Sequence, residues 1–175
     1  VRLEVHAATA GLRVQEPDVA WIAEPRLHLT VKFLGETADD RLDDLRATVA
    51  NVAGRHREFV LGFRGIGAFP NFRRARVVWM GIENEGRLEL LHHDIEIACE
   101  SLGYEIEGRA FRPHLTLARL KSPLDEERLR KLSRIAKQVD FQTECIVRSI
   151  DLMQSTLTSD GPSYTTLMSA ALRSD

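Results

Sequence analysis

The chain has 175 residues, of which 43% are hydrophobic and 29% charged, as is usual for a globular domain. A formal net charge of −2 excludes a protein that binds nucleic acid through overall positive charge, so any anion site must be local. The two cysteines, Cys99 and Cys145, form no Cys-x-x-Cys pair, and no apolar run approaches the roughly 20 residues that cross a bilayer. We therefore expect a cytoplasmic protein with no disulfide scaffold, zinc finger or membrane segment.

The first half of the chain predicts a helix, a strand and a second helix. Residues 1–14 fit both a strand period and a helix period, and their Ala and Leu content favours a helix. Residues 27–34 alternate as a strand does, which would put His28, Thr30 and Lys32 on one face. Thr37 and Asp40 resemble a capping box. The helix expected after them has an apolar stripe at Leu42, Leu45, Val49 and Val52.

The second half continues the alternation of strands and helices. Residues 58–70 predict a strand that runs into a Gly/Pro loop, and residues 75–82 predict a short buried strand. An apolar stripe over 88–102 predicts a helix that ends near Gly103. A further strand is expected at about 113–120, before a helix with Ser122 as its N-cap and Pro123 at its first position. The tail predicts two strands joined by a turn at the sequence SDGP.

His-Leu-Thr occurs twice, at 28–30 and 114–116, each time within an apolar run that precedes a predicted helix. This repetition suggests two lobes built on one plan. If the lobes face each other, two imidazoles and two threonine hydroxyls converge. One imidazole can then remove a proton and the other supply one, while hydroxyls hold the oxygens of a phosphate ester. The plainer alternative is that each histidine is a sheet residue hydrogen-bonded to its neighbour.

Two cations near the motifs could assist such a site. Lys32 would share the face of His28 and could contact phosphate, although a solvated surface charge explains it equally well. Arg119 lies five positions after His114, so regular alternation places it on the opposite face unless the strand contains a bulge or ends there. We expect no metal or other cofactor, because no set of Asp, Glu or Cys ligands accompanies the two histidines.

The two motifs, written in full as HLTVKFLGE and RPHLTLAR, resemble those of the 2H phosphoesterase superfamily. More narrowly, the chain is similar from about residue 12 to the RNA 2′,3′-cyclic phosphodiesterases, also called 2′-5′ RNA ligases. The segments GIGAFPNFRRARVVWMGI and SIDLMQSTLTSDGPSYTTL extend the resemblance.

The resemblance implies one bilobal α+β domain over residues 1–175, with two antiparallel sheets facing each other across a cleft and helices outside. It implies that the cleft is lined by His28, Thr30, His114 and Thr116. Arg119 matches the basic position after the second motif, and Phe33 matches an aromatic position for which core packing is expected. Phe69, Pro70 and Phe72 match a loop that borders the nucleotide. Such proteins usually open with a strand, which here is either RLEV at 2–5 or absent.

The implied reaction is hydrolysis of an RNA or nucleotide 2′,3′-cyclic phosphate to a 2′-phosphate, without metal, by a monomer that acts away from membranes. Two alternatives stay open: reversible 2′-5′ ligation at the same site, and a binding module for nucleotides or RNA ends that has no turnover. Because water is far more concentrated than RNA ends, hydrolysis should dominate over ligation unless water is excluded.

Overall fold

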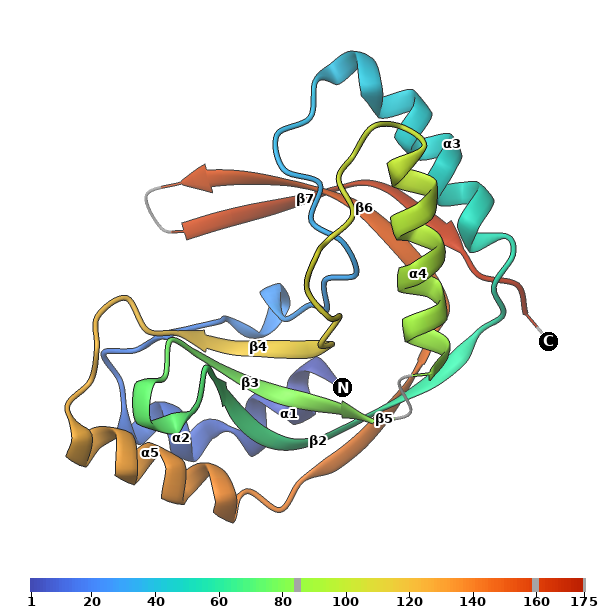
Figure 1. The fold of residues 1–175 in the computed structure, drawn as a ribbon. Helices are drawn as coiled ribbons and strands as arrows, with labels where there is room; N and C mark the ends of the chain where they lie inside the picture. Colours follow the sequence, from blue (N-terminus) through green and yellow to red (C-terminus); the bar gives the residue numbers. More distant parts are fainter. Residues whose placement is uncertain (84–85, 159–160, 175) are drawn as a thin grey trace. The chain divides into compact units, whose positions relative to one another are not determined.

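Two antiparallel sheets and five α-helices form the fold in the part of the chain that the computed structural model describes, residues 1–83, 86–158 and 161–174 (Figure 1). The α+β class with two antiparallel sheets is therefore confirmed. The helices are α1 (Arg2–Ala8), α2 (Ala10–Gln15), α3 (Leu42–Ala53), α4 (Gly86–Glu100) and α5 (Glu126–Gln138). The strands are β1 (Ala20–Trp21), β2 (Phe59–Phe69), β3 (Val77–Glu83), β4 (His114–Arg119), β5 (Gln142–Val147), β6 (Ser149–Thr158) and β7 (Gly161–Ala171).

The chain divides into two compact units, each made of three segments. Unit 1 contains residues 1–30, 61–84 and 113–145, and unit 2 contains residues 31–60, 85–112 and 146–175. The sequence suggested one His-Leu-Thr motif for each lobe, but both motifs belong to unit 1.

Unit 1 is built on the five-stranded sheet, whose strand order is β1-β4-β3-β2-β5. One face of the sheet carries buried apolar residues, among them Val78 and Met80 of β3 and Leu115 and Ala118 of β4. Helices α1, α2 and α5 contribute the other buried residues of this core: Val5, Leu12, Leu129, Leu132 and Ala136. The opposite face, at the same strands, is only half-buried and is available for polar side chains.

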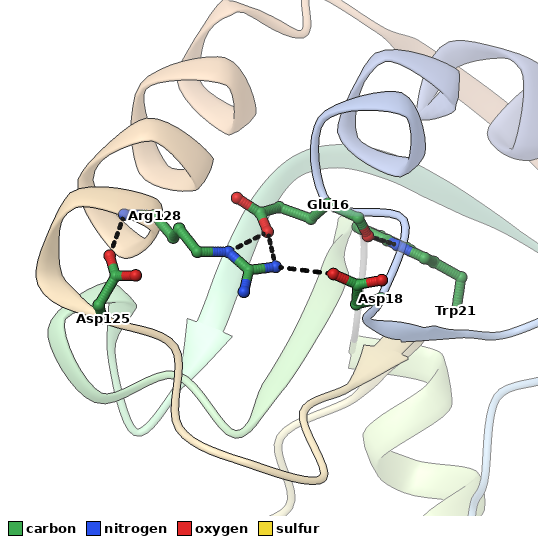
Figure 2. Close-up of polar contacts among 5 residues, drawn as sticks. All are labelled: Glu16, Asp18, Trp21, Asp125 and Arg128. Carbon is green, nitrogen blue, oxygen red and sulfur yellow. Dashed lines mark hydrogen bonds and ion pairs between the residues drawn. The ribbon is translucent and has the colours of Figure 1, made fainter.

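A polar network joins the α2–β1 turn to α5 within unit 1 (Figure 2). The carboxylate of Glu16 is 2% exposed, and its Oε2 accepts hydrogen bonds from Arg128 Nε at 2.8 Å and Nη2 at 2.6 Å. The hydrogen bond to Glu16 raises the pKa of Arg128 above its usual value. Trp21 donates its indole N–H to the Glu16 carbonyl at 2.8 Å. These contacts hold β1 at the edge of the sheet, where it pairs with β4.

Unit 2 consists of α3, α4 and the β6–β7 hairpin. Helix α3 packs against α4 and against both strands of the hairpin. The stripe predicted for α3 is confirmed, because Leu45, Val49 and Val52 are buried. The paired strands β6 and β7 confirm the prediction for the tail, although residues 159 and 160 of the expected turn lie outside the described residues.

Several local predictions are wrong. Residues 27–34 form no strand, because the alternation of Leu27, Leu29, Val31 and Phe33 is not matched by a partner backbone. Residues 2–5 are helical, so RLEV is not an opening strand. Strand β5 was not predicted as a separate element.

The predicted helix caps are also wrong. Neither Thr37 nor Asp40 caps α3, since the short 3₁₀ turn η2 (Asp39–Arg41) precedes this helix and no side chain caps either element. Asp125, and not Ser122, caps α5 by accepting the Arg128 N–H at 2.8 Å. Among the described residues, no helix has the length and apolar character needed to cross a membrane.

Candidate active site

The half-buried face of β4 presents the second His-Leu-Thr motif. His114 pairs with Gly81 of β3, and Thr116 pairs with Trp79. Because paired residues in antiparallel strands point to the same side of a sheet, His114 and Thr116 share this face. Leu115, between them, is buried in the core on the other side. An imidazole and a hydroxyl therefore lie in line on a rigid strand.

A bulge in β4 brings Arg119 to the same face. Ala118 pairs with Val78 and Thr116 pairs with Trp79, so Leu117 is an extra residue in β4. Leu117 and Ala118 are consecutive and both buried, which regular alternation would not allow. After the bulge, Arg119 pairs with Val77, which lies on the side of Trp79 and Gly81. Regular alternation would have placed Arg119 on the opposite face. The strand instead contains a bulge, as the sequence allowed, and Arg119 lies on the face of His114.

The aromatic ring of Phe69, at the end of β2, contacts His114 of β4. The ring of Phe69 stands perpendicular to the His114 imidazole, with 5.0 Å between centroids, and lies 5.1 Å from the ring of Trp79. Gly67 makes room for this cluster, since a Cβ there would come within 2.2 Å of the Trp79 ring. Phe69 was among the predicted site residues, and Trp79 was not. The position of Trp79 two residues before Gly81 in β3 was the available signal, because alternate residues of a strand share one face of the sheet.

The first motif lies in an extended loop. After β1, the N–H of Ile22 donates to the Leu117 carbonyl at 2.8 Å, which continues the antiparallel pairing beyond Trp21. The chain thus runs along β4 from its Arg119 end toward its His114 end. The 3₁₀ turn η1 (Glu24–Arg26) follows, and then Leu27, whose side chain is 2% exposed and anchors the loop. His28 and Thr30 are exposed within unit 1.

A hydrogen bond sets the tautomer of neutral His28. Its Nδ1 lies 2.7 Å from the carbonyl oxygen of Arg26. A carbonyl oxygen can only accept, so Nδ1 carries the proton and donates it. The lone pair of neutral His28 is therefore on Nε2.

Lys32 lies in unit 2, within a buried ion pair. Its Nζ donates to Glu96 Oε1 at 2.8 Å and to the Glu105 carbonyl at 2.9 Å, and the side chains of Lys32 and Glu96 are 3% and 4% exposed. The expected phosphate contact and the solvated surface charge are both replaced by this structural pairing.

The two remaining aromatic candidates lie in different surroundings from Phe69. Phe72 is half-buried in the 3₁₀ turn η3 (Phe72–Arg74), which packs against α5. Phe33 is 73% exposed, so its expected role in the core is wrong. Of the three aromatic candidates, Phe69 is the one whose ring contacts a motif histidine in the described part of the chain.

No group of three or more His, Cys, Asp or Glu side chains in the described ranges is placed to hold a metal ion. The candidate polar groups in unit 1 are the imidazoles of His28 and His114, the hydroxyls of Thr30 and Thr116, and the Arg119 guanidinium. This set can transfer protons near neutral pH and donate hydrogen bonds to an anion.

Comparison with known proteins gives consistent matches along the chain. A family model described as the 2′-5′ RNA ligase superfamily matches residues 2–158. An RNA 2′,3′-cyclic phosphodiesterase of Methanothermobacter thermautotrophicus is 31% identical over 154 residues, which cover 88% of this chain and 83% of that protein. A protein of the same name from Aeropyrum pernix is 35% identical, with coverage of 83% and 82%.

Two solved structures are similar over almost the whole chain. TT0787 of Thermus thermophilus superimposes with a TM-score of 0.79 at 32% identity, covering 98% of this chain and 93% of that one. E. coli LigT, solved in complex with 3′-AMP, superimposes with a TM-score of 0.68 at 25% identity, covering 97% of this chain and 91% of that one.

Proposed function

Because the chain belongs to the 2′-5′ RNA ligase superfamily, we propose that it hydrolyses RNA 2′,3′-cyclic phosphates to 2′-phosphates through His28 and His114. It is an RNA 2′,3′-cyclic phosphodiesterase, the activity for which its 31–35% identical relatives are named. The observation that carries the mechanism is the face of β4, on which His114, Thr116 and Arg119 lie together. The substrate is an RNA 3′ end or a nucleotide, and the cytoplasm is the proposed location.

The reaction is a displacement at phosphorus. One imidazole takes a proton from water as the water oxygen bonds to phosphorus. The P–O3′ bond breaks, the other imidazole protonates the O3′ that leaves, and the phosphate stays on O2′. Each proton transfer by a positioned group contributes roughly 10²–10⁴-fold to the rate.

The hydrogen bond to the Arg26 carbonyl suits His28 both as a general base and as a general acid. With Nδ1–H donated to that carbonyl, Nε2 takes a proton when His28 is the base and gives one when His28 is the acid. The same hydrogen bond orients the ring. The acid and base assignment between His28 and His114 is therefore a matter of which oxygen each faces.

Thr116 and Arg119 are suited to the phosphate oxygens that do not react. A hydroxyl and a guanidinium on one strand face donate hydrogen bonds to two oxygens and offset their negative charge. Thr30 provides a second hydroxyl from the first motif. Because these donors need no rearrangement during the reaction, they stabilise charge in the transition state more than water does.

The test is incubation with a short RNA that ends in a 2′,3′-cyclic phosphate, in excess chelator, with phosphorus NMR on the product. We expect the cyclic signal to be replaced by that of a 2′-phosphate monoester. A 3′-phosphate product, or loss of activity in chelator, would contradict the proposal. Binding of the RNA without turnover would instead identify a binding module.

The dependence of turnover on pH gives a second test. One imidazole must be neutral and the other protonated, so kcat/KM should rise and then fall around neutral pH. The two midpoints belong to the pair of histidines jointly. A rate measured across the acid, neutral and alkaline ranges that changes in one direction only would contradict the two-histidine mechanism.

A further inference from the structure

The loop between β2 and β3 borders a basic pocket in unit 1. The pocket has a volume of about 310 Å³ and is lined by three arginines and by apolar side chains: Arg73, Arg74, Arg76, Pro70, Leu124 and Leu129. Its lining residues include no carboxylate. The chain as a whole carries a net charge of −2, so three guanidiniums at one pocket are a local concentration of positive charge.

Hydrogen bonds hold this loop in a fixed shape. Asn71 Oδ1 accepts the Arg73 N–H at 2.9 Å, and the Asn71 carbonyl accepts the Arg74 N–H at 3.2 Å. Arg76 donates its N–H to the Phe69 carbonyl at 2.8 Å, and its own carbonyl accepts the Leu120 N–H at 2.9 Å. The turn η3 also packs against α5. The three guanidiniums therefore extend from an ordered base, which lowers the entropic cost of holding a ligand.

The same loop is joined at both ends to the candidate active site. Phe69, immediately before Pro70, packs against the His114 ring. Val77, immediately after Arg76, pairs with Arg119. The pocket and the face of β4 both belong to unit 1, and Leu129 of α5 places the pocket on the helix side of the sheet, so an RNA chain leaving the site would reach the pocket past the strand ends that this loop joins.

We propose that this pocket binds the RNA chain on the 5′ side of the reacting nucleotide, an inference that rests on the proposed function. Single-stranded RNA alternates phosphates with flat, largely apolar bases. Guanidiniums bind phosphate oxygens with paired N–H groups, and the Pro and Leu side chains provide an apolar surface for a base or ribose. The site thus selects RNA ends of several nucleotides over cyclic mononucleotides.

The first experiment compares substrate lengths. Steady-state kinetics would be measured for a 2′,3′-cyclic mononucleotide and for a series of progressively longer RNAs that end in the cyclic phosphate. We expect KM to fall with length in the wild-type protein. In the variant Arg73→Ala/Arg74→Ala, KM for the longest RNA should rise roughly 10-fold, since each lost charged hydrogen bond at an exposed site costs about 3- to 10-fold. Its kcat, and both constants for the mononucleotide, should stay unchanged.

Arg134→Ala is the matched control. Arg134 is exposed on α5 in the same unit and is not part of the pocket lining, so its removal tests the loss of a positive charge outside the pocket. A KM that does not depend on length, or a control that behaves like the double variant, would overturn the proposal. Absence of turnover on every substrate would instead count against the proposed function.

The second experiment does not depend on catalysis. Binding of a short fluorescent RNA with an ordinary 3′-hydroxyl would be measured by anisotropy over a series of salt concentrations. Each phosphate contact contributes about −0.7 to the slope of log K against log salt for single strands. The double variant should therefore flatten the slope by about 1.4. An unchanged slope would overturn the proposal even if turnover is lost.

Discussion

Replacing either motif histidine should lower turnover of an RNA 2′,3′-cyclic phosphate by roughly 10²–10⁴-fold. The reason is that one proton must leave the attacking water while another reaches O3′, and each variant removes one of the two groups. Removing both should cost much less than the product of the single losses, because the groups act in one step. The measurement is kcat and kcat/KM for His28→Ala, His114→Ala and the double variant.

A control is needed because His114 also packs against Phe69. His114→Gln keeps a polar side chain beside that ring, so it should match the alanine variant in kcat while retaining more of the thermal stability. His93→Ala, an exposed histidine of α4, should leave turnover unchanged. Activity within about threefold of wild type in either motif variant would rule out the paired mechanism, given the expected range.

The largest expected loss of stability comes from breaking the buried Lys32–Glu96 pair. Glu96 accepts from Lys32 Nζ at 2.8 Å through Oε1 and from the Glu107 N–H at 3.0 Å through Oε2. His92, stacked on Phe111, places Nε2 3.6 Å from the same Oε1. Glu96→Ala leaves the Lys32 ammonium buried without its carboxylate partner, so we expect the free energy of unfolding to fall by about 3–5 kcal/mol.

Urea unfolding of three variants separates the charge effect from packing. The apolar pair Lys32→Met/Glu96→Leu should recover most of the lost stability, since neither charge is then buried alone. Asp43→Ala removes the partner of Arg46 in an exposed pair of α3, and should change the free energy of unfolding by less than about 1 kcal/mol. If the single and double variants lose the same amount, the loss comes from packing and the charge argument is wrong.

The dependence of this stability on pH has a definite sign. Burial alone would raise the pKa of Glu96, but the hydrogen bonds from Lys32 and from the Glu107 N–H outweigh it and lower the pKa. A carboxyl whose pKa is lower in the folded state stabilises the fold above its unfolded pKa, about 4.3, and loses that contribution as the pH falls through the folded value. The wild type should therefore exceed Glu96→Gln in free energy of unfolding by the largest amount at neutral pH, and this difference should become smaller in acid.

The elements that could be predicted are those in which buried apolar residues recur at the regular spacing of a helix or a strand. The stripe of α3 and the strands β2, β3 and β4 were predicted because tertiary packing agrees with local pattern there. Residues 27–34 have the alternating pattern of a strand, but the described residues form no ladder with them, and sequence alone does not reveal pairing. The cap of α5 moved from Ser122 to Asp125 because both residues have suitable side chains and only the geometry decides between them.

Long-range partners were beyond local patterns. Lys32 and Glu96 are 64 positions apart, and nothing near Lys32 in the sequence indicates that its charge is buried. Trp79 was predicted only as part of a strand, while its contact with Phe69 depends on the register of β2 against β3. The motif histidines could be identified because each lies two positions before a threonine in a short local pattern. The residues that surround them could not be predicted, because they depend on strand pairing.

The extra residue in β4 makes the face on which Arg119 lies independent of whether one or two residues separate it from Thr116. Leu117 can be exchanged for another apolar side chain of similar size and the chain still reaches Val77 with Arg119. Deleting it would restore regular alternation, with Ala118 still opposite Val78 and Arg119 still opposite Val77, so Arg119 would stay on the face of Thr116. Homologous sequences should therefore carry either one or two apolar residues between Thr116 and Arg119, and the two-residue form needs the bulge. An alignment gap of one residue at that point would leave the guanidinium on the same face as Thr116.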